Sequence, residues 1–164
     1  MQDFEARNYR IDNVELNWAK LSKPVNPFGT EQWELQIATT DKAIADTWSS
    51  NHLNVKQDKV DSTKFTVSLK RKAVKANGDA NSAVRVVDSS AVALPHDKIA
   101  QIGNGSIGNV IVYQYPYSTA GREGIANSLT AVQVTDFKEY AAPVDFEPIV
   151  NEGSDTSNSS EMPF

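Results

Sequence analysis

Apolar and polar residues alternate in short segments along most of this chain, and the alternation constrains the fold more than any other feature. Val14, Leu16 and Trp18 alternate with Glu15 and Asn17. A period of two residues is typical of a β-strand that turns one face to a core and the other to solvent. The pattern recurs between turn-forming residues, so the sequence predicts strands over residues 14–18, 33–37, 65–70, 84–86, 110–117 and 129–140.

One segment between these strands has the pattern of a helix instead. Thr40 or Asp41 can cap a short helix that runs to about Ser50. Ile44 and Trp48 are four residues apart and therefore share one face of that helix, which we expect to pack on the core.

Turn signals order the remaining strands. Asn77-Gly78 predicts a tight hairpin from which the strand 84–86 returns, and a loop carrying Gly121, Arg122 and Gly124 joins the last two strands. Several short antiparallel strands with one helix favour a mainly β fold, a closed or partly closed barrel. Periodicity alone does not distinguish an OB-fold from another small barrel or a sandwich.

The charges are unevenly distributed along the chain. The net charge of −5 resides in the last 22 residues, because no Lys or Arg follows Lys138 while five acidic residues lie beyond Pro143. The segment 56–85 carries eight basic residues against three acidic ones. This asymmetry indicates a nucleic-acid-binding domain over 1–142 and a separate acidic tail over 143–164. A solvated strand face with a solubilising tail is the alternative.

Several classes of protein are disfavoured. The chain has no Cys, which argues against disulfides and zinc sites and fits a reducing cytoplasm, and no segment is apolar enough for a signal peptide or a membrane span. His52 and His96 have no metal-ligand spacing.

Residues 103–108 match G-x-G-x-x-G, but β-branched and aromatic residues follow, so the glycines predict a bend or bulge before a strand. We expect binding without catalysis, cofactor or metal; a metal-dependent nuclease is the less favoured reading.

The aromatic residues favour a nucleic-acid surface. Tyr113, Tyr115 and Tyr117 share one face of a strand whose opposite face carries the core candidates Val110 and Val112. Bases stack on such rings for about 1–3 kcal/mol each, whatever the sequence. The alternative is that these tyrosines cover the barrel end or pack on the helix.

The tryptophans and the basic residues complete the candidate site. Trp18 and Trp33 have the parity of their apolar neighbours, so we expect both in the core. The alternative for Trp33, which follows a loop, is a position at the edge of a groove. Trp48 is also predicted in the core. Lys70 and Lys72 face outward, as they also would on a solvated edge strand. The predicted single-stranded DNA site comprises Trp33, Lys70, Arg71, Lys72, Lys75, Arg85, Tyr113, Tyr115, Tyr117 and Arg122.

The acidic tail has the composition of a disordered segment with a binding motif at its end. It is polar and nearly devoid of apolar residues until Met162. An aromatic ring can fill a partner's pocket while acidic groups steer the encounter. We therefore expect a partner-binding motif at Glu161, Met162, Pro163 and Phe164, against the alternative of an ordinary frayed terminus.

Five segments resemble a known family. They are Trp18-Ala-Lys-Leu-Ser-Lys-Pro24 with Phe28-Gly-Thr-Glu-Gln-Trp33-Glu-Leu-Gln-Ile37, then Gly103-Asn-Gly-Ser106, Asn109-Val-Ile-Val-Tyr-Gln-Tyr-Pro-Tyr117 and Leu129-Thr-Ala-Val-Gln-Val-Thr-Asp136. They resemble phage single-stranded DNA-binding proteins of the short-tailed-phage replication type, and the tail resembles that of bacterial single-stranded DNA-binding proteins. The resemblance implies an OB-fold-like barrel that coats single-stranded DNA without sequence specificity during phage DNA replication or recombination.

The same resemblance implies partners. The tail would contact a polymerase, helicase or primase in the cytoplasm of an infected bacterium, and would occupy its own DNA groove when DNA is absent. This tail is less densely acidic than is common in the family. A homodimer or a cooperative assembly on DNA stays open. The alternative function is an OB-fold protein-interaction adaptor that does not bind DNA.

Overall fold

The computed structural model describes residues 4–26, 29–75 and 77–139. It contains seven strands and two helices in this part of the chain. They are β1 (Arg7–Val25), β2 (Gln32–Thr39), α1 (Lys42–Ser50), β3 (Lys56–Gln57), β4 (Phe65–Lys72), β5 (Arg85–Val87), α2 (His96–Ile99), β6 (Ser106–Thr119) and β7 (Arg122–Asp136). The six predicted strands and the predicted helix are present, and β3 and α2 are additional.

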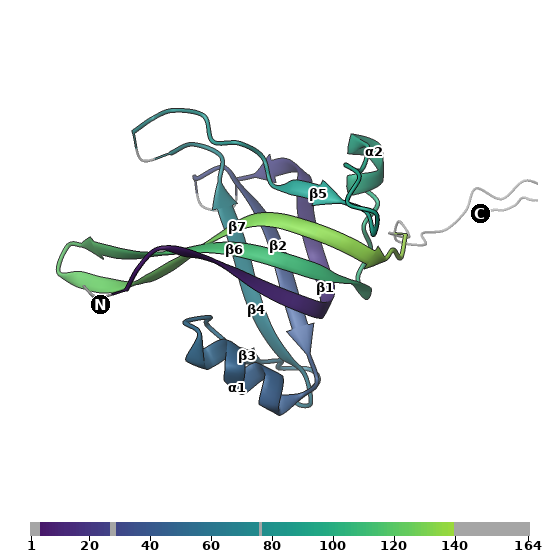
Figure 1. The fold of residues 1–164 in the computed structure, drawn as a ribbon, viewed down its shortest axis with the longest axis horizontal. Coiled ribbons are helices and arrows are strands. Elements are labelled where there is room, and N and C mark those ends of the chain that lie inside the picture. Colours follow the sequence, from purple (N-terminus) through teal and green to yellow (C-terminus); the bar gives the residue numbers. More distant parts are fainter. Residues whose placement is uncertain (1–3, 27–28, 76, 140–164) are drawn as a thin grey trace, which may run out of the picture.

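Five strands close a barrel, as Figure 1 shows. Antiparallel pairing runs in the order β4-β2-β1-β6-β7. The ring closes because β7 meets β4 in parallel, with Ser128 opposite Lys70. A five-stranded barrel with this order and a parallel closure is an OB-fold, which confirms the predicted fold class.

Inward-facing apolar residues fill the barrel. Val110 and Val112 on β6 are fully buried, as predicted, and Leu35 and Ile37 on β2 meet them from the opposite wall. Trp48 on α1 is also buried and closes one end of the barrel. The apolar face of α1 consists of Ala45 and Trp48, so the expectation that Ile44 packs beside Trp48 is wrong.

The chain after β4 departs from the predicted hairpin. A turn does form at Asn77-Gly78, with a φ of +91° at Gly78 and a bridge between Val74 and Ala80. However, β5 does not return along β4; it pairs in parallel with β7, at Ala131 to Gln133. The edge of β4 is already occupied by the closing contact with β7, so the returning strand joins the sheet farther along β7.

The β6–β7 hairpin extends well beyond the barrel (Figure 1). Its turn consists of Ala120 and Gly121, both with positive φ, as a two-residue turn that matches the strand twist requires. Arg122 and Gly124, expected in a loop, are instead paired with Thr119 and Tyr117. The hairpin therefore carries regular cross-strand pairs almost to its tip.

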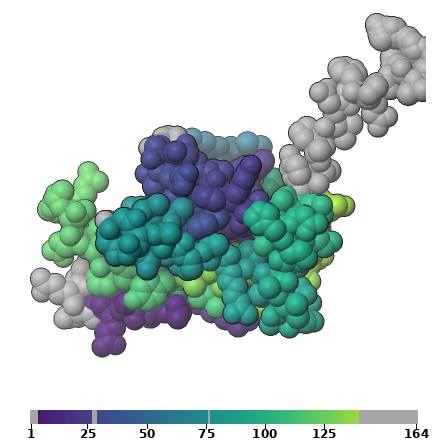
Figure 2. All heavy atoms as spheres, turned by 90° about the horizontal axis from the view of Figure 1, so that it is seen from above, coloured from purple at the N-terminus to yellow at the C-terminus, as the bar shows by residue number. Residues whose placement is uncertain are grey.

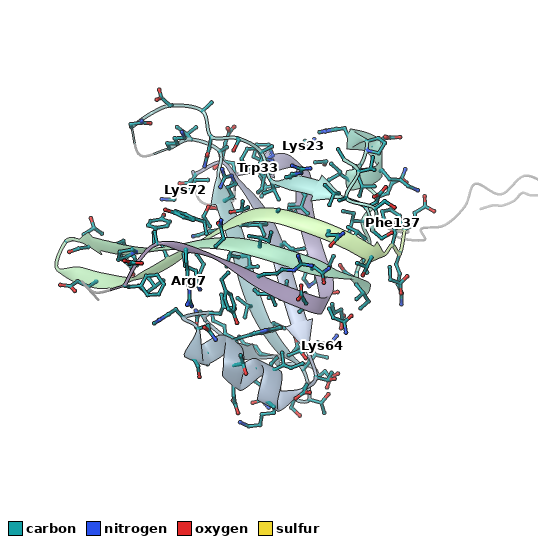
Figure 3. All side chains as sticks on the ribbon, viewed as in Figure 1. Arg7, Lys23, Trp33, Lys64, Lys72 and Phe137 are labelled. Atoms are coloured by element: carbon teal, nitrogen blue, oxygen red, sulfur yellow. The ribbon has the colours of Figure 1, made fainter. Side chains whose placement is uncertain are left out.

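A buried polar network fixes the base of this hairpin to α1. The Gln114 side chain is fully buried; its Nε2 donates to the Asn51 carbonyl at 2.7 Å and to Asn127 Oδ1 at 2.8 Å. Arg7 Nε donates to Gln114 Oε1 at 2.8 Å, and Figure 3 shows Arg7 on the side of the hairpin that faces α1. Asn127 Nδ2 donates to the His52 carbonyl. This face of the hairpin therefore packs on the helix end.

Candidate nucleic-acid interface

Trp18 lies on the outer surface of the barrel, with 62% of its area exposed. The prediction that it joins the core is wrong. From Asn17 to Lys20, β1 advances three residues while β2 advances two, from Gln36 to Glu34. The extra residue is a β-bulge, and it reverses the parity on which the prediction depended.

Contacts from a distant segment hold Trp18 in this position. Its φ of +52° is rare for a bulky residue and costs on the order of 1–3 kcal/mol. The Trp18 N–H donates to Asn104 Oδ1 at 2.7 Å, and the Gly105 N–H donates to Asn17 Oδ1 at 3.0 Å. Gly105 itself has a φ of +91°. Of the bend or bulge predicted from the glycines of residues 103–108, the bend is present at Gly105, directly before β6, and it supports an exposed aromatic ring.

A groove of about 640 Å³ runs beside Trp18 over the outer face of β2 and β4. Lys56 and Lys70 line it, together with amide and hydroxyl side chains and the carboxylate of Glu34. An exposed ring and two ammonium groups in one groove suit a ligand that combines flat bases with phosphates. The polar side chains that complete the lining are Gln32, Gln36, Asn54 and Ser68.

The groove continues onto the β6–β7 hairpin along one cross-strand row. Lys20 is opposite Glu34, Glu34 is opposite Lys70, Lys70 is opposite Ser128, and Ser128 is opposite Tyr113. Side chains of paired residues point to the same face of a sheet. Lys70 is therefore shared by the groove and by the surface that bears the tyrosines.

The three tyrosines form an open platform on the hairpin, each about 40% exposed. The rings of Tyr113 and Tyr115 are stacked, with centroids 5.6 Å apart and planes 28° apart. They neither cover the barrel end nor pack on α1, because it is the opposite face, with Gln114, that contacts the helix. The residues opposite the three tyrosines are all small: Ser128, Ala126 and Gly124.

Two further predicted residues extend this surface. Arg122 shares the face of the tyrosine row at the hairpin tip, because it pairs with Thr119. Lys72 is exposed two residues beyond Lys70 on the same face of β4, near Trp33 in Figure 3. Figure 2 shows the hairpin tip standing away from the body, with the segment after β4 on the surface beside it.

Other predicted residues are placed elsewhere. Trp33 is buried at 7% exposure, which confirms its predicted core position and leaves little ring area for stacking. Arg71 donates to Ser128 Oγ, Asn81 Oδ1, Ser82 Oγ and the Ser82 carbonyl, so most of its guanidinium is already engaged.

Arg85 and Lys75 lie apart from the groove. Arg85 lines a separate pocket of about 330 Å³ with Arg10, over an apolar floor that includes Ile111 and Ala131. Lys75 is exposed on the segment after β4. The predicted partner-binding residues Glu161, Met162, Pro163 and Phe164 lie outside the described residues, as does the whole acidic tail.

Sequence reasoning missed Trp18, Lys56 and Lys20. Lys56 lies on the two-residue strand β3, which is too short to show a period. The bulge at Trp18 is hydrogen-bonded to Asn104, 86 residues away along the chain, and no local pattern predicts it.

Other kinds of site find no support in the described part of the chain. It contains no group of three or more His, Asp or Glu residues placed to hold a metal ion. Among its helices, neither is long and apolar enough to cross a membrane. The Asp61 carboxyl lies in the turn before β4 and accepts hydrogen bonds from the Thr63 hydroxyl and N–H, which lower its pKa. Asp61 is exposed and is not part of the groove lining.

The solved structures that resemble this chain include phage proteins. The single-stranded DNA-binding protein from bacteriophage Enc34, solved in complex with single-stranded DNA, has a TM-score of 0.62 and 14% identity over 82% of this chain and 89% of that one. The single-stranded DNA-binding protein gp2.5 encoded by bacteriophage T7 has a TM-score of 0.55 and 15% identity over 84% and 91%. At this identity the likeness shows a shared fold. No family model and no curated protein sequence matches the chain.

Proposed function

We propose that this protein binds single-stranded DNA without sequence specificity and without chemistry. The observation that supports this most directly is the continuous outer face on which Trp18, Lys70 and the three tyrosines lie. Aromatic rings and ammonium groups on one open surface suit a ligand that combines flat bases with phosphates. The complex of the Enc34 protein with single-stranded DNA supports the same ligand for this fold.

The binding mechanism follows from the two parts of the face. Bases stack on Trp18 in the groove and on the platform of Tyr113 and Tyr115, while Lys56 and Lys70 neutralise phosphates between them. Stacking accepts any base, so the protein coats a strand of arbitrary sequence. Lys72 and Arg122 extend the positive charge along the path.

The wider role that we propose is the coating and protection of single strands during phage DNA replication or recombination, in the cytoplasm of an infected bacterium. Residues 143–164 would recruit replication proteins, such as a polymerase, helicase or primase, through Glu161, Met162, Pro163 and Phe164. The acidic composition of this segment also lets it compete with DNA for the lysines.

Tryptophan emission provides a direct test. Trp33 and Trp48 are buried, so quenching by an added oligonucleotide reports stacking on Trp18. We expect oligo-dT to quench the emission, and log affinity to fall linearly with log salt, by about 0.7 per phosphate neutralised. Trp18→Phe should abolish the quenching and keep most of the binding, which an unlabelled competition assay would detect.

The same titration on a chain that ends at Val150 tests the tail. Removing the acidic residues beyond this point should tighten binding at low salt and reduce capture of replication proteins. Absence of binding by both the full chain and the shortened one, at low salt, would reject the proposal in favour of an adaptor that binds only proteins.

A further inference from the structure

Glu34 is an acidic residue in the middle of an otherwise basic binding face. It lines the groove beside Trp18, and the residues opposite it on either side are Lys70 and Lys20. A face that bound only phosphate would gain nothing from a carboxylate here, because like charges repel. Its presence therefore indicates something about the part of the nucleotide that this groove receives.

The surroundings of Glu34 fix its orientation without neutralising it. Gln32 Nε2 donates to Glu34 Oε2 at 2.6 Å, and the Gln32 side chain is buried. Within the described residues, the ion pairs shorter than 4 Å are Arg10–Asp12, Lys42–Asp46 and Lys64–Glu15. Glu34 is in none of these pairs, so neither Lys20 nor Lys70 is held against it and both remain available to phosphates. Among the described residues, the Gln32 amide donates to Oε2, and Glu34 Oε1 stays open to a donor.

This arrangement determines how a strand would lie in the groove. Phosphates approach Lys70, Lys20 and Lys56 and avoid the carboxylate between them. The base attached to such a phosphate then turns toward Trp18 and Glu34. A carboxylate accepts hydrogen bonds only, so it favours a base edge with donors.

The bases differ in the donors that they offer. Cytosine, adenine and guanine carry an exocyclic amino group, and acidic side chains accept from the N4 amino group of cytosine. Thymine has no amino group, and its N3–H lies between two carbonyl oxygens that a carboxylate repels. Gln36 and Asn54, also in the groove, can hydrogen-bond to any base and do not create this bias.

We propose that the Trp18 groove is a base-selective subsite in which Glu34 prefers an amino-bearing base to thymine. The inference rests on the proposed binding of single-stranded DNA and narrows its indifference to sequence at one subsite: strands of any sequence still bind, and Glu34 adds a preference of about fivefold there. The preference concerns the one or two nucleotides that enter this groove, and the tyrosine platform stays indifferent to sequence.

The test compares oligo-dC and oligo-dT of equal length at pH 8 and one salt concentration, for the wild type, Glu34→Gln and Asp97→Asn. Glutamine has the shape of glutamate and can also donate to the thymine carbonyls. Asp97 on α2 is exposed and is not part of the groove lining, so its substitution removes the same charge elsewhere. We expect Glu34→Gln to lower the dC-to-dT affinity ratio about fivefold and Asp97→Asn to leave the ratio unchanged.

A second measurement uses only the wild-type protein. Replacing cytosine by N4,N4-dimethylcytosine removes both amino donors, and we expect the affinity to fall about fivefold toward that of oligo-dT. The inference is overturned if the dimethylated oligonucleotide binds like oligo-dC, or if Glu34→Gln keeps the wild-type ratio. If the wild type binds none of the oligonucleotides, the proposed function itself fails.

Discussion

The groove beside Trp18 and the tyrosine platform on the hairpin present aromatic rings in two different ways. In the groove, a single ring is held by a strained backbone whose N–H donates one hydrogen bond to Asn104, in a segment far along the chain. On the hairpin, three rings follow from regular pairing between two adjacent strands. The first arrangement places one ring rigidly beside selected polar groups, whereas the second repeats one ring along a strand. Rigid placement suits selectivity, and repetition suits coating.

The hairpin depends on one buried polar side chain for its orientation, so the largest expected effect concerns Gln114. Gln114→Leu removes one hydrogen bond each from Arg7, Asn127 and the Asn51 carbonyl, while the bonds from Arg7 to Asn51 Oδ1 and from Asn127 to the His52 carbonyl remain. Each of these three hydrogen bonds to the buried Gln114 contributes about 1 kcal/mol, so we expect a loss of about 3 kcal/mol in the free energy of unfolding by urea.

The control for this variant is the same substitution at an exposed glutamine. Gln57→Leu on β3 removes one surface hydrogen bond, to the Ser62 carbonyl, and should change stability by less than about 0.5 kcal/mol. Equal effects of the two substitutions would show that the network does not hold the hairpin.

The two surfaces can be compared by removing one ring from each. Trp18→Ala should weaken oligo-dT binding by about 2 kcal/mol and Tyr115→Ala by about 1 kcal/mol, because the indole ring is larger. Both residues are exposed, so the thermal midpoint should change little. Titrations of the single and double variants at one salt concentration measure these losses.

The double variant decides whether the two surfaces bind one strand. Losses that add within about 0.5 kcal/mol indicate two independent contacts on one path. A double variant no weaker than Trp18→Ala would mean that the platform contributes to DNA binding only through the groove.

The rigidity of the groove can be tested at Asn104. Asn104→Ala removes the acceptor for the Trp18 N–H and should lower stability by about 1 kcal/mol, with easier quenching of Trp18 by acrylamide. Asn104→Asp keeps an acceptor oxygen and should behave like the wild type in the quenching experiment. Equal quenching in both variants would show that the bulge holds Trp18 without this hydrogen bond.

The same contrast explains which features the sequence predicts. The parity of Tyr113, Tyr115 and Tyr117 survives in the structure because their strand is regular where they lie. The parity of Trp18 does not, because a bulge shifts it and the hydrogen bond that accompanies the bulge comes from the distant Asn104. Alternation predicts local strand faces, whereas bulges and parallel closures depend on partners that are distant in sequence.

The basic residues show the same limit. Lys70 faces outward as its position on β4 predicts, and its pairing with Ser128 joins the groove to the tyrosines. Arg85 was expected on a strand that returns along β4 and instead lines another pocket, because β5 pairs with β7. The sequence therefore predicts the fold class and, of the binding face, the tyrosine platform. The strand pairing that closes the barrel decides which basic residues lie beside the aromatic rings.

The smallest expected effect concerns the contact between Tyr117 and Gly124. A Cβ built at Gly124 would lie 2.9 Å from the Tyr117 hydroxyl oxygen, so Gly124→Ala requires the ring to shift. The ring is the flexible, exposed end of its side chain, and the lower entropy of the unfolded alanine chain offsets the strain, so stability should change by less than about 0.5 kcal/mol. Oligo-dT affinity should fall about twofold, or about 0.4 kcal/mol, because the displaced ring stacks less well. A loss of stability above about 1 kcal/mol would instead show that the ring is locked on Gly124, and that the platform shares the rigidity of the groove.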